Sequence, residues 1–367
     1  MRRKISLKLI TSFLLLTAFV SFGQNEVEQV PEHEPKTDKK TEIKEYIQHH
    51  LMDSYDFGLF SYETDAGEDK HFGFPLPVIL WDNGLKVFSS SKFHHGETVA
   101  EVDGNFYRVH HAKIYKVDGI DGEIIEDAHH HATNEKPLDF SITKNVSLIF
   151  MVFGILFFMF SRMAKAYKNN NGMPTGMGRF LEPIVLYVRD EIAIPNIGEK
   201  HYKRFMSYLL TVFFFVWIIN LFGLTPIGMN LTNNIAVTFC LSILTYLITT
   251  FSGNKNYWKH IFWMPGVPVP MKIILAPIEL LGTFIKPFAL MIRLYANITA
   301  GHIVLMSIIG MMFVFHNWIG SSLSFLLAFV LGILELLVAA LQAYIFTVLS
   351  ALYFGMAVEE HHHDEAH

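Results

Sequence analysis

The sequence predicts a membrane all-α protein with five transmembrane segments, the last two of them long tilted helices, preceded by a small β-rich extracytoplasmic domain. Hydrophobic residues make up 51% of the 367 residues and charged residues only 17%, whereas soluble domains carry about 25% charged residues. The charges are also unevenly spread. Residues 24–139 contain 11 Lys or Arg and 24 Asp or Glu, and residues 140–367 contain 14 and 10. The chain therefore divides into an acidic polar part and an apolar part.

Composition also excludes several kinds of partner and site. The single cysteine, Cys240, excludes an intrachain disulfide framework and any zinc or iron–sulfur site built on cysteines. A net charge of −5 without a basic stripe argues against a nucleic-acid partner. The sequence contains no Gly-rich Lys-Ser/Thr loop of the P-loop type. We therefore expect no cofactor and no phosphate chemistry in this chain.

A secretory signal peptide is predicted over residues 1–23. Basic residues lead an apolar stretch, and small residues precede a plausible cleavage point before Gln24. An uncleaved membrane anchor is the alternative, because Leu9 to Asn25 is just long enough to span a bilayer. Both interpretations place the next segment outside the cytoplasm. Residues 24–44 are acidic and nearly free of large apolar side chains, so we expect a flexible tether.

Residues 45–139 are predicted to form the small β-rich extracytoplasmic domain. The segment Pro77–Val87 has the pattern of two strands around Asn83-Gly84, a pair that suits a two-residue type I′ turn. Residues 106–117 have the pattern of a second strand pair. Short apolar runs alternate with polar residues across the whole segment.

Histidines are concentrated in this first part of the chain, where 11 of the 19 occur. They include His94-His95, His110-His111 and the run at 129–131. Metal binding is one interpretation, because neutral imidazole is a common metal ligand. Adjacent residues of a strand point to opposite faces of the sheet, however. This alternation favours a solvated surface, and we expect no metal site.

Five apolar runs are long enough to cross the hydrocarbon core, which needs about 20 helical residues. The predicted spans are approximately residues 145–161, 206–224, 234–252, 273–314 and 322–356. Residues 205–254 contain no charged side chain, and the turn-like segment Gly223–Gly228 divides them into two spans. The last two runs exceed one perpendicular span, so we expect both helices to be strongly tilted.

The distribution of Lys and Arg between the loops predicts the orientation. Residues 162–204 contain eight basic residues and the loop 255–272 contains three, whereas the turns near Pro226 and Trp318 contain none. These counts place the N-terminal domain outside and the C-terminus in the cytoplasm. Apolar residues also recur among charges in residues 178–194, which suits a helix on the inner membrane surface or against a partner.

Charged residues inside the apolar runs are the main functional signal, because a charge at the bilayer centre costs about 2.5–3.5 kcal/mol on insertion scales. Glu279, Lys286 and Arg293 are seven residues apart and share one helical stripe. Asn297 lies one turn beyond Arg293, whereas His302 points to the opposite side. For Glu279 and Lys286 the alternative is the solvated face of a surface helix. Arg293 lies too deep among apolar residues for that interpretation.

His302 and Glu335, on successive apolar segments, form a candidate proton relay, because both side chains can gain and lose a proton. Gln342 follows Glu335 by seven residues. Arginine stays charged and cannot carry protons. Arg293 therefore suits an electrostatic barrier that repels cations and favours ionisation of a nearby carboxylic acid. A second subunit that supplies this acid is implied.

Four motifs in the same order resemble subunit a of the membrane sector of F-type ATP synthases, over residues 145–361. The strongest is KPFALMIRLYANITAGH at 286–302, which resembles the segment around the essential arginine of that family. The supporting motifs are NLFGLTP at 220–226, LQAYIF at 341–346 and EEH at 359–361.

The resemblance implies a proton-translocating stator subunit that couples proton flow to ATP synthesis without catalysis of its own. Such a subunit lies in the inner membrane beside a rotating ring of c subunits, with peripheral-stalk b subunits as further partners. Arg293 would face the ring between two half-channels, near Asn297 and Gln342. His302 and Glu335 would line the outer half-channel. Glu279 matches an acidic position of the inner half-channel.

This chain departs from the family pattern at three places. Many bacterial members have an acidic residue where this chain has His302 and a histidine where it has Glu335. The exchange of the pair suggests that the two side chains lie close together. A position that is often Ser is Gly282 here, and residues 24–139 have no counterpart in the general pattern.

Two other functions fit part of the sequence. One is a secondary cation or metal transporter with a His-rich external binding domain, although no internal repeats are visible. The other is an envelope binding protein whose membrane part is only an anchor. Five spans and deeply placed charges argue against an anchor.

Overall fold

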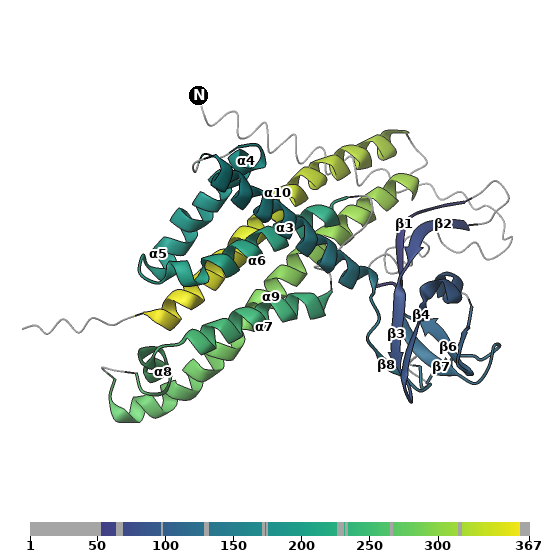
Figure 1. The fold of residues 1–367 in the computed structure, drawn as a ribbon, viewed down its shortest axis with the longest axis horizontal. Helices are drawn as coiled ribbons and strands as arrows, with labels where there is room; N and C mark the ends of the chain where they lie inside the picture. Colours follow the sequence, from purple (N-terminus) through teal and green to yellow (C-terminus); the bar gives the residue numbers. More distant parts are fainter. Residues whose placement is uncertain are drawn as a thin grey trace, which may run out of the picture. The chain divides into compact units, whose positions relative to one another are not determined.

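A computed structural model describes residues 53–63, 69–96, 98–127, 132–170, 173, 175–225, 231, 234–264, 267–314 and 318–359. The predicted signal peptide and tether, and the histidines at 129–131, lie outside the described residues. Within them, the chain forms eight short strands followed by helices, and Figure 1 follows this order through the colours of the ribbon. Five of the helices are long and apolar enough to cross a membrane. The predicted fold class is therefore confirmed.

The β-rich part consists of small antiparallel sheets. The strands are β1 (Asp56–Glu63), β2 (Asp69–Pro75), β3 (Pro77–Trp81), β4 (Leu85–Ser89), β5 (Ala100–Val102), β6 (Asn105–His110), β7 (Lys113–Val117) and β8 (Leu138–Asp139). They pair as β1-β2, as β4-β3-β8 and as β5-β6-β7. Alternate residues of β3 and β4 are buried, including Val78, Leu80 and Phe88, which pack with Phe93 and Tyr107 in one core. This alternation is the period-2 pattern of a sheet with one buried face.

Both predicted hairpins are confirmed, but the turn expected at Asn83-Gly84 differs from the prediction. Trp81 pairs with Leu85, so β3 and β4 are joined by a three-residue loop and not by the expected two-residue turn. The two-residue turn occurs instead between β6 and β7, where His110 pairs with Lys113. The turn residues His111 and Ala112 both have positive φ, 46° and 58°, as a type I′ turn requires.

A buried carboxylate explains the longer loop. Asp82 is only 8% exposed, and its side chain accepts a hydrogen bond of 2.9 Å from the Tyr107 hydroxyl. The Lys116 ammonium lies 3.0 Å from the same carboxylate. These two hydrogen bonds, the one from Lys116 first, hold the pKa of Asp82 below its usual value. Tyr107 of β6 and Lys116 of β7 therefore hold Asp82 in place, and the β3–β4 loop has three residues because Asp82 belongs to it and not to a strand.

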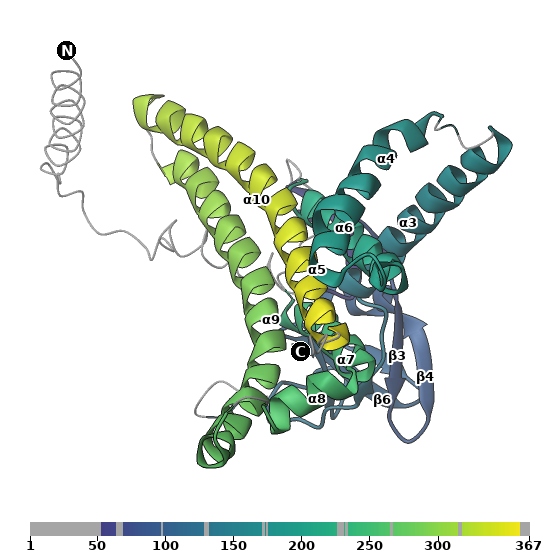
Figure 2. The ribbon, with the colours of Figure 1, turned by 90° about the vertical axis from the view of Figure 1, so that its left-hand side faces the viewer.

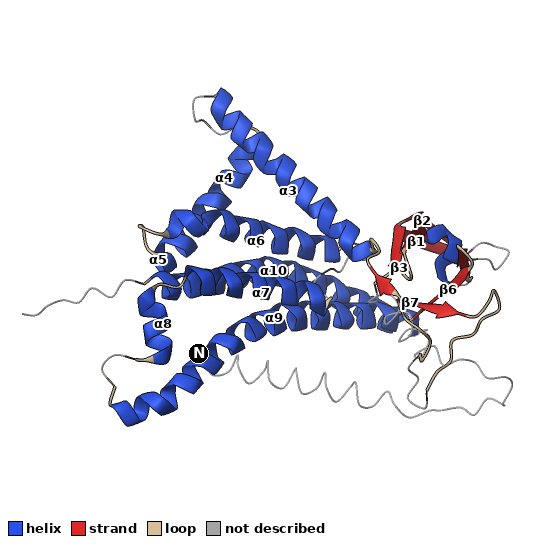
Figure 3. Ribbon diagram, turned by 60° about the horizontal axis from the view of Figure 1, so that its bottom comes forward, coloured by secondary structure: helices blue, strands red, loops and turns tan. Residues whose placement is uncertain are grey.

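The membrane helices are α3 (Lys144–Asn169), α6 (Tyr202–Gly223), α7 (Ile235–Ser252), α9 (Val269–Val314) and α10 (Trp318–Val358). Shorter segments are α4 (Met177–Tyr187), the π-helical η2 (Val188–Ala193), α5 (Ile194–Ile197) and α8 (Lys255–Phe262). Helix α9 has 46 residues, which at 1.5 Å per residue is about 69 Å, roughly twice the hydrocarbon thickness. Pro277 and Pro287 lie inside it and remove backbone donors. Figure 3 shows that α9 bends along its length.

One apolar core joins α10 to α6 and to the segments η2 and α5, which precede α6 in the chain. The rings of Phe205 and Phe354 stack with centroids 4.7 Å apart. A residue larger than glycine would not fit at position 355, because a Cβ on Gly355 would lie 1.9 Å from the carbonyl oxygen of Asn196. Val188 and Ile192 are fully buried in this core. The helix expected on the membrane surface thus packs on its own chain through part of its apolar face.

The Asp82 contacts predict a pH-dependent stability of the β-rich domain. Replacing Asp82 with Asn should cost about 1–3 kcal/mol at neutral pH, because a charge-assisted pair with Lys116 is lost. Hydrogen exchange of those β5–β7 amides that exchange by unfolding of the domain should therefore be about 5- to 150-fold faster in the full chain. Because the folded-state pKa of Asp82 is lowered, its stabilisation is complete above about pH 4 and is lost as the pH falls below that value.

The variant Asp121→Asn is the matched control. Asp121 is exposed, so its replacement should leave the hydrogen-exchange rates unchanged. Equal exchange in the Asp82→Asn variant and the wild type would contradict a stabilising role for Asp82.

Candidate functional site

The two longest helices enclose the candidate site. Helices α9 and α10 run side by side in Figures 1 and 2. Together with the end of α6 they line a cavity of about 380 Å³. The polar residues of its wall are Asn220, Asn297, His302, Glu335 and Gln342. The other residues that line it are glycine, alanine, valine or leucine. The polar groups therefore converge inside an otherwise apolar space.

Four of the six predicted site residues meet in this cavity. Asn297 of α9 donates a hydrogen bond of 3.1 Å to Gln342 of α10, which links the two helices. Gln342 is 2% exposed and His302 is 6% exposed. The opposite placement of His302 and Arg293 on α9, expected from their nine-residue spacing, agrees with the buried histidine and the exposed arginine. His302 and Glu335 line the same cavity although 33 positions separate them in the sequence.

Gly301 allows the carboxylate of Glu335 to approach α9. A Cβ built on Gly301 would lie 3.5 Å from Oε1 of Glu335, so this carboxylate lies against the backbone next to His302. Oε2 of Glu335 is buried and has no hydrogen-bond partner among the described residues. A buried polar atom of this kind usually binds water, an ion or a proton. Glu335 is therefore a group that can exchange a proton within the cavity.

Arg293 lies outside the cavity, on the exposed side of α9. Ala289 and Ala296, one helical turn before and after it, are exposed as well, so the turns that flank the arginine on this face carry small side chains. The neighbouring Phe288 and Ile292 are 49% and 55% exposed. Among the described residues no carboxylate forms an ion pair with Arg293. A permanent cation thus stands on an apolar surface that a second helix can approach closely.

Glu279 and Lys286 do not join the cavity. The Lys286 ammonium lies 5.5 Å from the centroid of the Tyr353 ring and lines a second, much smaller cavity of about 10 Å³ with Thr283 and residues of α7. Glu279 is half-buried and is not among the residues named for either cavity. The polar residues of α9 therefore belong to two regions. The first is the large cavity, which Asn297 and His302 line, and the second is the surroundings of the smaller cavity, which Lys286 lines. Arg293 lies between them, about 10 Å from Lys286 and about 6 Å from Asn297 along the helix axis.

Two groups of polar residues were missed by the sequence analysis. The first is Asn220 of α6, which is buried, lines the large cavity and donates to the carbonyl oxygen of Ala339 at 3.4 Å. The second is a stripe of buried hydroxyls on α7, at Thr238, Ser242, Thr245, Thr249 and Ser252. Their spacing of three and four residues is visible in the sequence and is the period of one helix face.

Four of the five hydroxyls of this stripe, those of Thr238, Ser242, Thr245 and Thr249, are satisfied within their own helix. Thr245 donates to the carbonyl oxygen of Leu241 at 3.1 Å and Thr249 to that of Thr245 at 2.7 Å. The hydroxyl of Tyr208 lies 2.8 Å from that of Thr245. Such bonds allow polar side chains to lie inside a membrane helix without unpaired groups. The stripe faces the smaller cavity through Ser242, Thr245 and Thr249.

This arrangement suits proton transfer better than bond-making chemistry. The large cavity holds a histidine and a carboxylic acid, both of which exchange protons, together with amides that can orient water. The only cysteine, Cys240, is exposed on α7 and away from both cavities.

Comparison with known families divides the chain into two matched parts. A family model described as ATP synthase A chain matches residues 146–355, which include both cavities and all five membrane helices except the start of α3 and the end of α10. A second model, described as a domain of unknown function (DUF8433), matches residues 46–140, which include all eight strands.

Curated relatives agree with the first match. ATP synthase subunit a of Chloroherpeton thalassium is 44% identical over 237 residues, which are 62% of this chain and 70% of the relative. The subunit a of an Anaeromyxobacter species is 40% identical over 66% of this chain and 62% of its own length. ATP synthase subunit a 2 of Prosthecochloris aestuarii is 36% identical over 81% of this chain and 95% of its length.

The Gly301–Glu335 contact predicts how the cavity can be closed. Gly301→Leu should fill it, whereas Gly301→Ala should fit, because a Cβ at 3.5 Å from Glu335 is an ordinary contact. Water access can be followed with a hydrophilic thiol reagent on Val338→Cys, a cavity position, after Cys240→Ser. Gly301→Leu should slow this labelling about tenfold or more, by excluding water from the cavity.

Gly332→Leu on α10 is the control, because nothing lies within 4 Å of a Cβ at Gly332. If the Gly301→Leu substitution left the rate of labelling unchanged, the reagent would not reach Val338→Cys through this cavity.

Proposed function

Because the chain belongs to the ATP synthase A chain family, the subunit a family of F-type ATP synthases, we propose that it is the proton-translocating stator subunit of such a synthase. Family membership makes it a multi-pass membrane subunit of the ATP synthase complex. Its role would be to conduct protons beside a rotating ring of c subunits and so to couple proton flow to ATP synthesis. The chain itself would be non-catalytic, with the ATP chemistry on other subunits.

The observation that carries the proposal is the position of Arg293. It is an exposed cation in a membrane helix, without an ion pair among the described residues. A charge at the bilayer centre costs at least about 2.5–3.5 kcal/mol. A carboxylate on a c subunit would offset this cost, and the alanines around Arg293 leave room for the helix that carries it. The pairing would favour the ionised carboxylate and hence release of its proton.

The large cavity supports an outer proton path. Protons would enter it past Glu335 and His302 and then reach a carboxylate of the c ring before that carboxylate meets Arg293. The hydrogen bond between Asn297 and Gln342 lies one turn from Arg293 and would hold α9 and α10 in register at the transfer point. The neutralised carboxylate could then move through lipid as the ring turns.

The second polar region supports an inner path. It would combine Lys286 of α9 and the hydroxyls of α7, which line the smaller cavity, with Glu279, which lies about two helical turns before Lys286 on α9. Gly282 stands where many members have Ser, and the hydroxyl of Thr283, next along the chain, lines the smaller cavity. Arg293 lies between the two regions and would prevent protons from passing directly from one to the other.

The remaining assignments follow from the loop charges and the family. The chain would lie in the inner membrane with residues 45–139 outside and the C-terminus in the cytoplasm, and peripheral-stalk b subunits would be further partners. Residues 1–23 would act as a signal peptide, residues 24–44 as a tether and residues 140–367 as the proton-channel domain. The alternative function, a secondary cation or metal transporter, is not favoured by the family match.

Arg293→Ala should abolish coupled ATP synthesis in inverted membrane vesicles while the complex still assembles. The loss should be about 100-fold or more, the size found when one preorganised electrostatic group is removed from an active site. Arg179→Ala is the control, because Arg179 is an exposed arginine of α4 outside the membrane helices. Proton-driven synthesis at the normal rate in the Arg293→Ala variant would refute the proposal.

Exchanging His302 and Glu335 should retain more activity than replacing either with alanine. Both side chains line one cavity, so the exchange keeps a histidine and a carboxylic acid on the path, whereas each single change removes one proton carrier. ATP-driven proton pumping, followed by fluorescence quenching in vesicles, measures the difference. If the exchanged variant pumps no better than the Glu335→Ala variant, the two residues do not act as a pair.

A further inference from the structure

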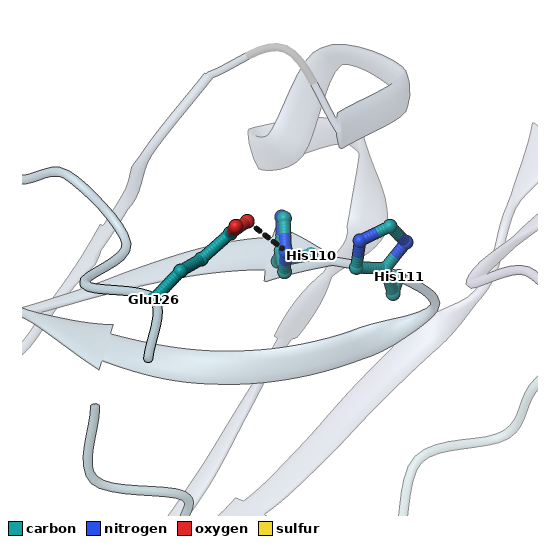
Figure 4. Close-up of side chains that lie close together, drawn as sticks. All are labelled: His110, His111 and Glu126. Carbon is teal, nitrogen blue, oxygen red and sulfur yellow. Dashed lines mark ion pairs between the residues drawn. The ribbon is translucent and has the colours of Figure 1, made fainter. Parts of the chain in front are cut away.

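The β-rich domain carries a cluster of side chains that the proposed proton path does not use. His110, His111 and Glu126 place one ligand atom each within 4.8 Å of one another. Figure 4 shows the carboxylate of Glu126 directed toward His110, with His111 beside it. We propose that these three residues form a binding site for a divalent transition metal ion such as Zn²⁺.

The turn between β6 and β7 brings the two histidines to the same side. Adjacent residues of a strand point to opposite faces, and for this reason the sequence analysis favoured a solvated surface. His111 does not belong to a strand, because β6 ends at His110 and His111 is the first turn residue, with φ of 46°. The ring centroids of His110 and His111 are consequently only 4.0 Å apart. The expectation that neighbouring histidines diverge is wrong at this position, and the left-handed turn is the physical reason.

Glu126 is held in place by its backbone. Residue 126 pairs with Ala132 in an isolated β-bridge. The side chain of Asn134 accepts a hydrogen bond of 2.7 Å from the backbone amide of Ile125 and donates one of 3.3 Å to the carbonyl oxygen of Lys116 in β7. The segment that carries Glu126 is thus tied to the same hairpin that carries the histidines. This preorganisation reduces the ordering needed when an ion binds.

The distances fit a transition metal after small side-chain movements. Nε2 of His110 and Oε1 of Glu126 are 3.2 Å apart, close to the separation of about 3.4 Å between two ligands of a tetrahedral zinc ion with bonds of about 2.1 Å. His111 is exposed and can rotate to close the remaining distances. Two imidazoles and one carboxylate are typical zinc ligands, whereas Ca²⁺ and Mg²⁺ prefer oxygen ligands alone. Three ligands leave one position for water.

Zn²⁺ titration of the full chain in detergent tests the proposal, with bound metal measured by equilibrium dialysis. The test variants are His110→Gln, His111→Asn and Glu126→Gln; Asn suits the positive φ at position 111. His94→Asn is the matched control, because His94 is also an exposed histidine with positive φ, 41°, but lies outside the cluster. Circular dichroism verifies that each variant retains its fold.

The proposal predicts that each test variant loses one equivalent of tightly bound Zn²⁺, or binds it at least about tenfold more weakly, whereas His94→Asn binds like the wild type. Millimolar Mg²⁺ should not compete. Binding that is equal in the three test variants and in the wild type would overturn the site. Replacing the histidines at 129–131 with alanine provides a further discrimination. Loss of Zn²⁺ in that variant alone would assign the metal to those residues and refute the site at the hairpin.

Discussion

The structure depends most on one constraint, a permanent positive charge on an apolar helix that no described carboxylate of the chain neutralises. Arg293 cannot lose its proton, and in hydrocarbon it needs either a counter-ion or water. The described part of the chain gives it neither a carboxylate in ion-pair distance nor a buried position. The remaining polar groups of α9 are arranged on both sides of it. Within the proposed function, a carboxylate of a second subunit would satisfy this group.

Sequence reasoning succeeded where a feature depends on one helix alone. Length and absence of charge predicted five spans, and the helices of the structure differ from the predicted bounds by only a few residues, apart from the C-terminal end of α3. The spacing within α9 predicted that Arg293 and His302 lie on opposite sides. Contacts between helices were less accessible. The sequence has no direct sign that Gly301 lets Glu335 approach, or that Asn220 contacts the backbone of α10, because such contacts depend on how helices cross.

The β-rich domain illustrates a different limit, which concerns local geometry. Composition and alternation were sufficient to predict both hairpins, yet the one turn that was predicted, at Asn83-Gly84, was wrong, and the tight turn of the second hairpin was not foreseen. Asn83-Gly84 has the preferred sequence for a two-residue turn, but burial of Asp82 against Lys116 determines a longer loop. The less typical pair His111-Ala112 adopts the tight turn. Tertiary contacts therefore override turn preference, and the faces on which neighbouring side chains lie change with them.

The polar groups of the membrane part differ in how they are satisfied, and this difference separates stability from function. Four of the five buried hydroxyls of the α7 stripe bond to carbonyl oxygens of their own helix, so they can line a path for water or protons at little cost to the fold. Asn297 and Gln342 satisfy each other across α9 and α10 and so contribute to packing. Oε2 of Glu335 has no hydrogen-bond partner in the part of the chain that the structure describes, and Arg293 has no ion-pair partner there. Since a polar group without a partner destabilises the fold, packing alone does not explain the presence of these two residues, and we attribute them to function.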